Sequence, residues 1–294
     1  MSYFFIVNPV SGRGKTARAW EQLKVMLKAE NVPFSYALTQ APGHAAELAK
    51  EAVEKGFTSC IGVGGDGTLH EMLPALVGTQ TALGCIPTGT GNDFARALGI
   101  PKEMPAQLSW LKEASRVQID VPYLNDTPYL NVAGIGFDAV VAETVNRRFR
   151  SLRGLLPYLL GVFTTLISYK NTPVTIHLDG RPPMQQKVFL IAVGNMQYYG
   201  GGFRICPQAV PNDGLLDFCI AGDISKTGTL SMLPKTLKGE HLAHPQCRYL
   251  QAKEAFIDGP PLPMQADGQN IGSLPAVFRV APGALWILTP HGSL

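Results

Sequence analysis

Short apolar runs and helical patterns follow one another through the first hundred residues. Four runs have the length and composition of buried strands, and apolar residues at helical spacing over 20–27 predict an amphipathic helix. Further helices are expected over about 44–55 and from near Thr68 and Asp93. The predicted strands are 3–7, 34–38, 59–63 and 82–87. This alternation predicts parallel strands joined by right-handed crossovers, which form an α/β lobe with a doubly wound, mostly parallel sheet.

The pattern of apolar and polar residues changes in the second part of the chain. Short apolar segments now end at glycine turns, and the Asp-Gly pairs at 179–180, 258–259 and 267–268 are typical of hairpins. This pattern predicts a mostly antiparallel β domain interrupted by helices. The strand candidates are 174–180, 187–195, 215–222, 254–259, 276–281 and 284–288, and the helix candidates are about 138–149, 152–170 and 226–241.

The change of pattern divides the chain into two predicted domains. The α/β domain spans 1–120, and residues from about 283 to 294 are expected to return to it. The β-rich domain spans 121–282. With 46% apolar and 16% charged residues, the 294-residue chain has enough apolar side chains for two well-packed cores.

Charge, cysteines and apolar segments narrow the class of protein. A net charge of +3 is too small to indicate a nucleic-acid binder. The five cysteines lack Cys-x-x-Cys spacing, so we expect reduced core thiols in a cytoplasmic protein. The start of the chain has no basic region before a long apolar one, which argues against a signal peptide. The apolar segment 152–170 contains a proline and two glycines, and we expect a buried or interfacial helix there instead of a membrane span.

Three glycine-bearing loops follow predicted strands of the α/β domain. They occupy 8–14, 64–68 and 88–91, at the carboxyl edge of the sheet, where doubly wound folds bind ligands. Glycines let the backbone approach a phosphate, and amides at a helix N-terminus favour negative charge. A single glycine-bearing loop could be an ordinary tight turn. Three such loops at one edge of the sheet indicate a nucleotide or polyphosphate site. The spacing departs from Gly-x-Gly-x-x-Gly and from the P-loop motif, which argues against a dinucleotide-binding Rossmann enzyme and a P-loop ATPase.

The same loops carry a family resemblance. The segments NPVSGRGK, GGDGTLHE and PTGTGNDFAR, in this order, closely resemble the diacylglycerol kinase catalytic domain family of bacterial lipid kinases, which is related to sphingosine kinases and NAD kinases. The later segments NVAGIGFDA, CPQAVPNDGLLD and ADGQ also match, so the resemblance covers nearly the whole chain. It implies the fold of NAD kinases and diacylglycerol kinases, with a nucleotide-binding first domain and a lipid-substrate second domain.

In this family the glycine loops bind ATP. The resemblance makes Asp66 a nucleotide-binding and catalytic residue, and it places Thr39 near the phosphates, although Thr39 could equally be a turn residue. Glu71 is expected at the nucleotide or its metal, with a surface salt bridge as the alternative. The residues implied in ATP binding are Asn8, Ser11, Gly12, Thr39, Gly64, Gly65, Asp66, Gly67, Thr68, Glu71, Thr88, Gly89, Thr90, Gly91 and Asn92.

A second motif resembles the magnesium loop of the family. The segment PQAVPNDGLLD implies a Mg²⁺ ion held by the Asp213 side chain and the carbonyl oxygens of Val210 and Leu215. Hard cations prefer such oxygen ligands, although Asn-Asp-Gly also makes an ordinary turn. Asp120 matches a family aspartate that links this ion through water to the magnesium of ATP; from the residues alone it could equally be a paired structural acid.

The chain departs from the family where the general base is expected. The family has an acidic residue at the end of an Asp-Gly-Glu/Asp turn, and this chain has Gln269 after Asp267 and Gly268. Because glutamine does not accept a proton at neutral pH, the role is expected to pass to Asp267, Asp66 or water. Phosphoryl transfer depends mainly on positioning and charge neutralisation, so we expect a slow kinase.

These observations predict an ATP- and Mg²⁺-dependent lipid kinase that phosphorylates a hydroxyl of a membrane lipid such as diacylglycerol. The alternatives are a weak or inactive nucleotide-binding regulatory protein and a soluble-substrate kinase of the NAD type. The resemblance further implies a role in phospholipid biosynthesis, peripheral contact with the inner face of the membrane, and a homodimer, without a nucleic-acid partner.

Histidines and arginines give weaker signals. The three histidines at 44, 70 and 241 lack the spacing of metal ligands, so we expect solvated or helix-capping roles for them. Arginines beside the apolar segment 155–167 predict either a solvated helix face or an interfacial helix that meets anionic headgroups. These are Arg147, Arg148, Arg150 and Arg153.

Overall fold

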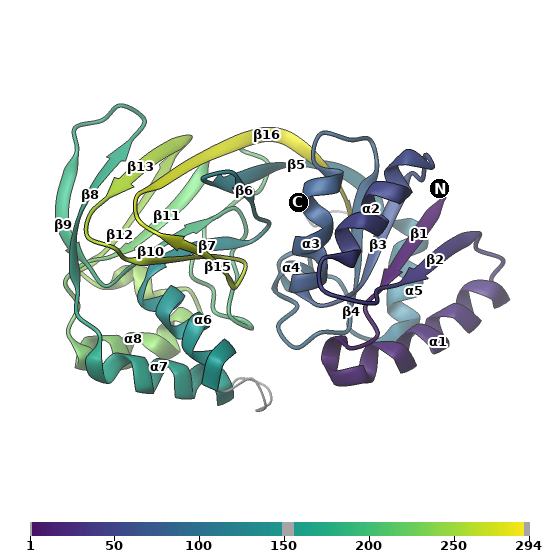
Figure 1. Cartoon of the computed structure of the whole chain (residues 1–294), viewed down its shortest axis with the longest axis horizontal. Helices are drawn as coiled ribbons and strands as arrows, with labels where there is room; N and C mark the ends of the chain where they lie inside the picture. Colours follow the sequence, from purple (N-terminus) through teal and green to yellow (C-terminus); the bar gives the residue numbers. More distant parts are fainter. Residues whose placement is uncertain (1, 149–155, 291–294) are drawn as a thin grey trace. The chain divides into compact units, whose positions relative to one another are not determined.

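The computed structural model describes residues 2–148 and 156–290, and the chain divides into two compact units (Figure 1). The N-terminal unit contains the residues up to Val121 and those from Pro282 onward, and the C-terminal unit contains Pro122–Ala281. The chain passes between the units along two strands. These are β5 (Ser115–Leu124) and β16 (Ala276–Thr289).

The N-terminal unit is built on a parallel sheet with the order β2–β1–β3–β4. The last part of β16 adds a parallel neighbour to β4, where Ile287 pairs with Leu83. The strands are β1 (Tyr3–Val7), β2 (Phe34–Leu38), β3 (Ser59–Gly64) and β4 (Ala82–Pro87). The helices are η1 (Ser11–Gly14), α1 (Lys15–Ala29), α2 (His44–Glu54), α3 (Asp66–Leu76), α4 (Asp93–Ala97) and α5 (Met104–Glu113). This arrangement confirms the predicted doubly wound α/β lobe.

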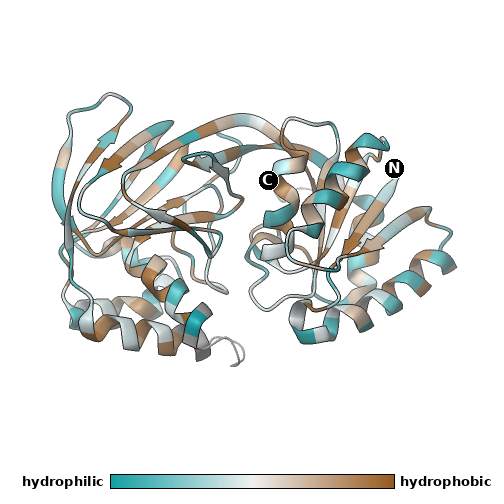
Figure 2. Cartoon of the chain, in the orientation of Figure 1, coloured by the Kyte–Doolittle hydropathy of each residue, from teal (hydrophilic) through white to brown (hydrophobic). Residues whose placement is uncertain are grey.

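Burial accounts for the elements of the N-terminal unit. All five residues of β1 are buried, as expected for a continuous apolar run inside a parallel sheet. The helix α1 buries Trp20, Leu23 and Leu27, which are the residues at helical spacing. The Trp20 ring packs on the ring of Phe5 in β1, with centroids 5.2 Å apart. Figure 2 shows the hydropathy of these elements: the strands are mainly apolar, and the helices carry both polar and apolar residues.

The C-terminal unit contains an antiparallel sheet with the order β12–β11–β10–β7–β14–β15 and a second set of antiparallel strands, β16–β13–β8–β9. The first sheet consists of β7 (Val132–Gly136), β10 (Leu190–Gly194), β11 (Leu216–Ala221), β12 (Cys247–Ala252), β14 (Pro263–Ala266) and β15 (Gln269–Ser273). The other strands are β6 (Thr127–Pro128), β8 (Thr172–Leu178), β9 (Met184–Val188) and β13 (Glu254–Asp258). The helices are α6 (Phe137–Arg148), α7 (Leu156–Ser168), α8 (Lys226–Thr236) and η2 (Glu240–Ala243).

Two apolar layers stabilise the C-terminal unit. Alternate residues of β10 point to opposite faces of the sheet. Ile191 and Val193 pack in a core shared with β8, β13 and β16, whereas Leu190 and Ala192 pack in a second core with residues of α6, α7 and α8. The antiparallel β domain predicted from the sequence is therefore a sandwich with a helical layer on one outer face.

Two predicted strand boundaries were wrong. The segment 187–195 was predicted as one strand, but the chain leaves β9 and enters β10 at Phe189, where it passes from one sheet to the other. The segments 276–281 and 284–288 were predicted as two separate strands. They form the continuous strand β16, because the Gly283 N–H donates to Asp120 Oδ1 at 2.8 Å and so keeps this position bonded to β5.

Candidate functional site

The predicted nucleotide loops lie at the carboxyl ends of the parallel strands. The order β2–β1–β3–β4 places the switch point of the doubly wound sheet between β1 and β3, where such folds bind ligands. Asn8 follows β1, Thr39 follows β2, Gly65 follows β3 and Thr88 follows β4. The structure therefore brings all three glycine loops and Thr39 to one edge of the sheet.

Side chains connect these loops. Asn8 Nδ2 in the first loop donates to Thr68 Oγ1 in α3 at 3.1 Å. The half-buried Asp66, at the start of α3, accepts the N–H of Phe94 through Oδ1 at 3.0 Å. Because Phe94 lies in α4, directly after the third loop, this bond fixes the carboxylate between the second and third loops.

Three glycines in these loops are required by close packing, and for two of them the contact is between one loop and another. A Cβ on Gly12 would lie 2.2 Å from a carbonyl oxygen of the third loop, and a Cβ on Gly89 would lie 2.5 Å from Cα of Gly65. A Cβ on Gly64 would meet the Thr68 hydroxyl oxygen at 2.5 Å. Gly12 and Gly89 are explained by the approach of loop to loop, and Gly64 by a contact within its own loop. The sequence could not distinguish these contacts from the approach of a loop to a ligand.

Gly67 has a different environment. Its φ is not positive, and a Cβ at this position would meet no atom within 4 Å. Gly67 is exposed in the first turn of the 11-residue helix α3, where backbone N–H groups have no partner within the helix. Neither backbone conformation nor internal packing requires a glycine here. Bare backbone beside these N–H groups suits a phosphate, because a helix N-terminus favours negative charge.

Two buried amide oxygens in the same loops have no hydrogen-bond partner among the described residues. They are Oδ1 of Asn8 and Oδ1 of Asn92. Asn92 has a left-handed φ of 52°, and its Nδ2 donates to Gly89 O at 3.0 Å, so its side chain is held in place. Buried polar atoms are nearly always hydrogen-bonded. A donor group of a nucleotide, or a cation, fits both oxygens.

The other predicted nucleotide residues have varied surroundings. Glu71 Oε2 accepts the N–H of Gly43 at 3.0 Å, so this side chain joins α3 to the start of α2. The carbonyl oxygen of Gly91 accepts a guanidinium N–H of Arg96 at 3.1 Å. Ser11 and Thr39 are half-buried, and Thr90 is exposed.

The turn that carries Gln269 lies in the C-terminal unit. Asp267 and Gly268 form a two-residue loop between β14 and β15, with φ of 47° and 83°, as in type I′ hairpin turns. The Asp267 carboxylate accepts backbone N–H groups of residues 130, 131 and 132 at 2.7, 3.0 and 3.3 Å. Asp267 thus anchors the turn to the start of β7. Gln269 is exposed beside it.

A buried pair of side chains, Gln265 and Asp138, holds this turn in place. Gln265 Oε1 accepts the Gly268 N–H at 2.7 Å, and Gln265 Nε2 donates to Asp138 Oδ2 at 3.2 Å. Burial raises the pKa of Asp138 to about 6. A Cβ on Gly134 would lie 1.6 Å from Asp138 Oδ2, so a glycine is required there. Sequence reasoning identified the segment around Asp138 but missed its contact with the turn.

The predicted magnesium residues fall into both units. Asp213 is exposed, and its Oδ1 accepts the Leu215 N–H at 3.0 Å, while Val210 lies in the same exposed loop. Asp120 belongs to the N-terminal unit, where it is buried and accepts the Gly283 N–H. Among residues 2–148 and 156–290, no cluster of three or more His, Cys, Asp and Glu side chains is arranged to hold a metal. A site built from one carboxylate and backbone carbonyls stays a prediction.

One histidine prediction was wrong. His241 was expected to be solvated or to cap a helix, yet it is 2% exposed, and its Nε2 lies 3.0 Å from Ile205 O. Because a carbonyl only accepts, Nε2 carries the proton in this bond. Burial lowers the pKa of His241. His44 is half-buried at the start of α2, and its Nδ1 accepts the Gln40 N–H at 3.1 Å, which ties the preceding turn to the helix without capping it.

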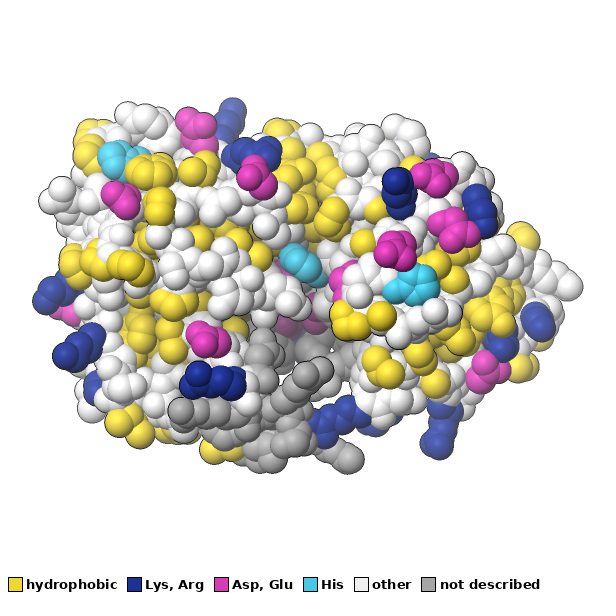
Figure 3. Space-filling view, viewed as in Figure 1, with side chains coloured by type: hydrophobic (Ala, Val, Ile, Leu, Met, Phe, Trp, Pro, Cys, Tyr) yellow, Lys and Arg dark blue, Asp and Glu magenta, His cyan; other side chains and the backbone are white. Residues whose placement is uncertain are grey.

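The cysteines and the surface charges agree with the sequence analysis. All five cysteines are free thiols, and four of them are buried. On the face drawn in Figure 3, described Lys and Arg side chains are interspersed with Asp and Glu side chains. Such mixing is consistent with the net charge of +3.

The apolar helix α7 is partly exposed. It buries Val162 and Leu166, whereas Phe163 and Ile167 are 51% and 75% exposed. Within the described parts of the chain, no helix has the length and apolar character needed to cross a membrane. Arg147 is exposed at the end of α6. The side chains of the other predicted interfacial arginines, Arg148, Arg150 and Arg153, lie outside the described residues.

Comparisons with known proteins agree with this architecture. The diacylglycerol kinase catalytic domain model matches residues 2–123, and the YegS C-terminal NAD kinase beta sandwich-like domain model matches residues 131–289. A diacylglycerol kinase from Mycobacterium tuberculosis is 33% identical over 98% of this chain and 95% of its own length.

Solved structures show the same fold. The crystal structure of a putative diacylglycerol kinase from Bacillus anthracis has a TM-score of 0.82 and 26% identity, covering 100% of this chain and 98% of that one. An NAD kinase from Archaeoglobus fulgidus shares the fold, with a TM-score of 0.56 at 14% identity over 100% of this chain and 95% of that one. The two-domain fold is thus that of diacylglycerol kinases and NAD kinases. The chain belongs to the diacylglycerol kinase family of lipid kinases.

Proposed function

We propose that the chain transfers the γ-phosphoryl group of ATP to a hydroxyl of a membrane lipid, with diacylglycerol as the first candidate acceptor. Family membership supports a kinase, and the relative from Mycobacterium tuberculosis is named a diacylglycerol kinase. The observation that carries the proposal is Gly67. Its bare backbone, which no internal contact requires, lies at a helix N-terminus on the ligand-binding edge of the sheet.

The phosphates of ATP would lie against the first turn of α3. Backbone N–H groups there would donate to phosphate oxygens. The partnerless oxygens of Asn8 and Asn92 would accept N–H groups of the nucleotide or coordinate its metal. Asp66 is negatively charged, so we assign it to the metal and not to the phosphates themselves; its bond to the Phe94 N–H holds the carboxylate in a fixed orientation. Bound Mg²⁺ would supply charge neutralisation at the transferred group.

The loop around Asp213 would hold a second, structural Mg²⁺. One Asp213 oxygen is engaged by the Leu215 amide. The second oxygen and the carbonyl groups of Val210 and Leu215 have the chemistry that hard cations prefer. The role of this ion would be to fix the loop before β11.

Proton removal from the lipid hydroxyl is the step at which this chain differs from the family pattern. Gln269 has no basic group, and the Asp267 carboxylate bonds to three backbone amides. We therefore assign Asp267 first to holding the turn and only second to accepting a proton. Transfer through a loose transition state needs limited help from a base, which supports a slow kinase.

The substrate is a membrane lipid, so the proposal includes peripheral contact with a membrane. The helix α7 presents Phe163 and Ile167 to solvent, and Arg147 is exposed at the end of the preceding helix. An exposed apolar helix face, together with an exposed cation at the end of the preceding helix, suits a surface with anionic headgroups.

The test is phosphoryl transfer from labelled ATP with Mg²⁺ in mixed micelles. The acceptors are dioleoylglycerol, a polyprenol, a sphingoid base and, without micelles, NAD. We expect transfer to a lipid, with dioleoylglycerol as the best substrate, and no transfer to NAD. Transfer to NAD alone would identify a soluble-substrate kinase, and tight ATP binding without transfer to any acceptor would identify a regulatory protein; either result contradicts the proposal.

A further inference from the structure

The buried residue Thr16 joins the first and third glycine loops of the N-terminal unit. It lies in the first turn of α1 and is fully buried. Its Oγ1 lies 3.0 Å from the carbonyl oxygen of Ser11 in the first loop and 2.6 Å from Oγ1 of Thr88, which follows β4. Thr16 was not among the residues expected at ATP, yet it touches two residues that were. All three lie within one unit, so their contacts do not depend on the placement of the other unit.

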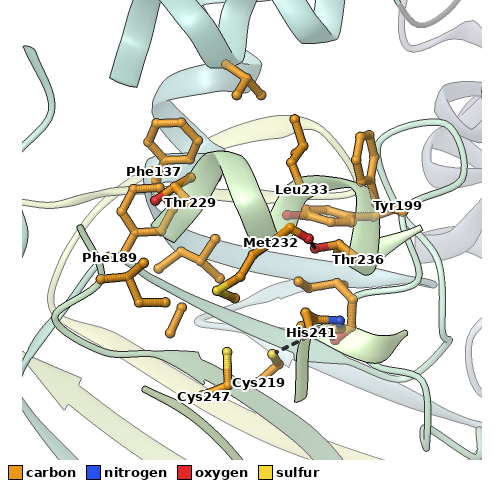
Figure 4. A pocket seen from close by; sticks show the side chains of 16 residues that line it. Phe137, Phe189, Tyr199, Cys219, Thr229, Met232, Leu233, Thr236, His241 and Cys247 are labelled. Carbon is orange, nitrogen blue, oxygen red and sulfur yellow. Dashed lines mark hydrogen bonds between the residues drawn. The ribbon is translucent and has the colours of Figure 1, made fainter. Parts of the chain in front are cut away.

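The partners of Thr16 determine where two hydroxyl protons lie. A carbonyl oxygen only accepts, so the single proton of the Thr16 hydroxyl is donated to Ser11 O. In the pair with Thr88, the Thr16 oxygen therefore accepts and the Thr88 hydroxyl donates. The same rule places a proton on Nε2 of His241 (Figure 4), which faces a backbone carbonyl oxygen in the C-terminal unit. The half-buried Thr88 hydroxyl thus keeps a lone pair at the ligand-binding edge but has no proton to offer a ligand.

Two asparagines of the same loops are divided in the same way. Asn8 Nδ2 donates to Thr68 Oγ1 at 3.1 Å, and Asn92 Nδ2 donates to Gly89 O at 3.0 Å. The Oδ1 atoms of both asparagines have no hydrogen-bond partner among the described residues. In each case the protein engages a donor and leaves an acceptor. The start of α3 has the opposite character, because a helix N-terminus presents N–H donors.

A nucleotide carries its donors and acceptors at different ends. Its phosphate oxygens accept hydrogen bonds and suit the N–H groups at the start of α3. The ribose hydroxyls and the adenine amino group can donate. A hydroxyl whose proton is already engaged cannot donate to a phosphate oxygen. The acceptor left at Thr88 therefore matches the nucleoside end of ATP.

We infer that Thr88 accepts a hydrogen bond from a donor group of the nucleoside, either a ribose hydroxyl or the adenine amino group, and that Thr16 is the positioning residue for this contact. The inference rests on the proposed function, because it takes ATP as the phosphoryl donor, and it adds how the nucleoside is recognised. Thr16 does not touch the nucleotide. Its hydroxyl holds the Thr88 proton away from the ligand and anchors the first loop through Ser11 O.

Calorimetry of nucleotide binding to the full-length protein, without lipid, tests the inference. The ligands are ATP, 2′-deoxy-ATP, 3′-deoxy-ATP, the triphosphate of purine riboside, which lacks the amino group, and inorganic tripolyphosphate. The wild type should bind ATP about threefold to tenfold more tightly than one of the three analogues, since this is the worth of one neutral hydrogen bond. The analogue that binds more weakly identifies the donor group.

Nearly isosteric variants locate the contact. Thr88→Val should bind ATP and that analogue equally, and Thr16→Val should lose most of the preference. The matched control is Thr81→Val, because Thr81 is also buried and donates to a backbone carbonyl, that of Phe57, but at the opposite end of β4. It should keep the preference. Tripolyphosphate should bind the wild type and Thr88→Val alike, because it has no nucleoside.

A merely structural role of Thr16 gives a different result. Thr16→Val would then weaken ATP and all analogues by the same factor and leave the preference intact, which would overturn its assignment. In the Thr88→Val background, Thr16→Val should have no further effect on the affinity for ATP. Should Thr16→Val not fold, Thr88→Val and Thr16→Ser decide the matter, since serine keeps the hydroxyl and should keep the preference.

Two results would overturn the contact at Thr88. One is equal binding of ATP and all three analogues by the wild type, and the other is weakened tripolyphosphate binding by Thr88→Val, which would place a phosphate at this hydroxyl. Failure of the proposed function is a separate result. A wild type that prefers ATP over one analogue but phosphorylates no lipid would support the inference and contradict the lipid kinase, whereas transfer to a lipid without any preference would contradict the inference alone.

Discussion

In the N-terminal unit each candidate site residue lies within a few positions of the strand that carries it, whereas the turn at Asp267 is held by partners up to 137 positions away. The first site is assembled mainly from backbone: glycines, helix N-termini and loops that follow parallel strands. The second is assembled from buried polar side chains, Asp267, Gln265 and Asp138, that connect distant segments.

This difference predicts how the two sites respond to substitution. A backbone site tolerates changes of side chain where no packing is involved and fails where one loop touches another. A side-chain network loses several hydrogen bonds when one member changes, because its buried partners are left unsatisfied. The following predictions test the contrast, from the largest expected effect to the smallest.

Asp66→Asn should have the largest effect on activity. The amide oxygen of asparagine can still accept the Phe94 N–H, so the fold should be retained. Removal of the charge at the metal should lower kcat by about 100-fold or more, as loss of a preorganised electrostatic group does. Circular dichroism and a melting curve check the fold, and single-turnover transfer measures the rate. An unchanged rate in the folded variant would remove Asp66 from the mechanism.

Gln269→Glu should raise the rate. It introduces a carboxylate two positions after Asp267, on the exposed strand end beside the turn. General-base help is typically worth about 10²–10⁴-fold, so a gain of about tenfold or more is expected even with imperfect geometry. The gain should disappear at low pH as the new carboxylate takes up a proton. A variant that binds ATP normally and shows no gain would mean that no base is needed at this turn.

Gly67 and Gly89 should respond in opposite ways to alanine. Gly89→Ala should destabilise the unit by about 1–3 kcal/mol, because its Cβ would overlap the backbone at Gly65. Gly67→Ala should leave the unfolding free energy unchanged or raise it by up to about 1 kcal/mol, because its site is open and helical. It should nevertheless weaken ATP binding about tenfold by holding the phosphates away from the backbone.

Calorimetry of ATP binding and chemical denaturation together decide this comparison. If Gly67→Ala bound ATP as tightly as the wild type, the phosphates would not approach this turn. If Gly89→Ala were as stable as the wild type, the contact between the second and third loops would not limit the packing of the site.

The sequence allowed the fold and the first site to be anticipated more fully than the second. The strands 3–7, 34–38 and 82–87 were predicted at the bounds that β1, β2 and β4 have, because each is a short, mainly apolar run between turn residues. Loops that follow parallel strands must meet at one edge, so the topology alone brought Asn8, Asp66 and Asn92 together.

The second site depends on contacts that no local pattern reveals. The role of Gln265 follows from its hydrogen bonds to Gly268 and to Asp138, which lies 127 positions away in the sequence. A single buried glutamine leaves no periodic pattern from which these bonds could be predicted. His241 was expected to be solvated or to cap a helix for the same reason: its burial under distant parts of the chain leaves no signal in the residues around it.

Asp138→Asn should have the smallest effect and should appear as a change in pH dependence. The folded-state pKa of Asp138 is raised to about 6, so the native state retains a proton that the unfolded chain releases from about pH 4 upward. The unfolding free energy therefore falls as pH rises toward and through 6. Between pH 5 and 7 this group should account for about 1 kcal/mol of loss, which the asparagine variant should lack.

Denaturation at several pH values measures this slope. Asp217, whose pKa burial also raises to about 6, remains in the variant and should leave a residual slope of the same sign. Equal slopes in the variant and the wild type would show that the Asp138 carboxyl does not titrate in this range.

The pairing of β16 with β4 has a consequence for the order in which the protein can be made. The strand that covers the outer side of β4 lies at Ile287, close to the end of the 294-residue chain. During synthesis the N-terminal sheet therefore leaves the ribosome with the outer edge of β4 unpaired, and this edge stays unpaired while the whole C-terminal unit is translated. An unpaired edge is an aggregation hazard. Nascent chains halted before residue 282 should accordingly engage chaperones that full-length chains release.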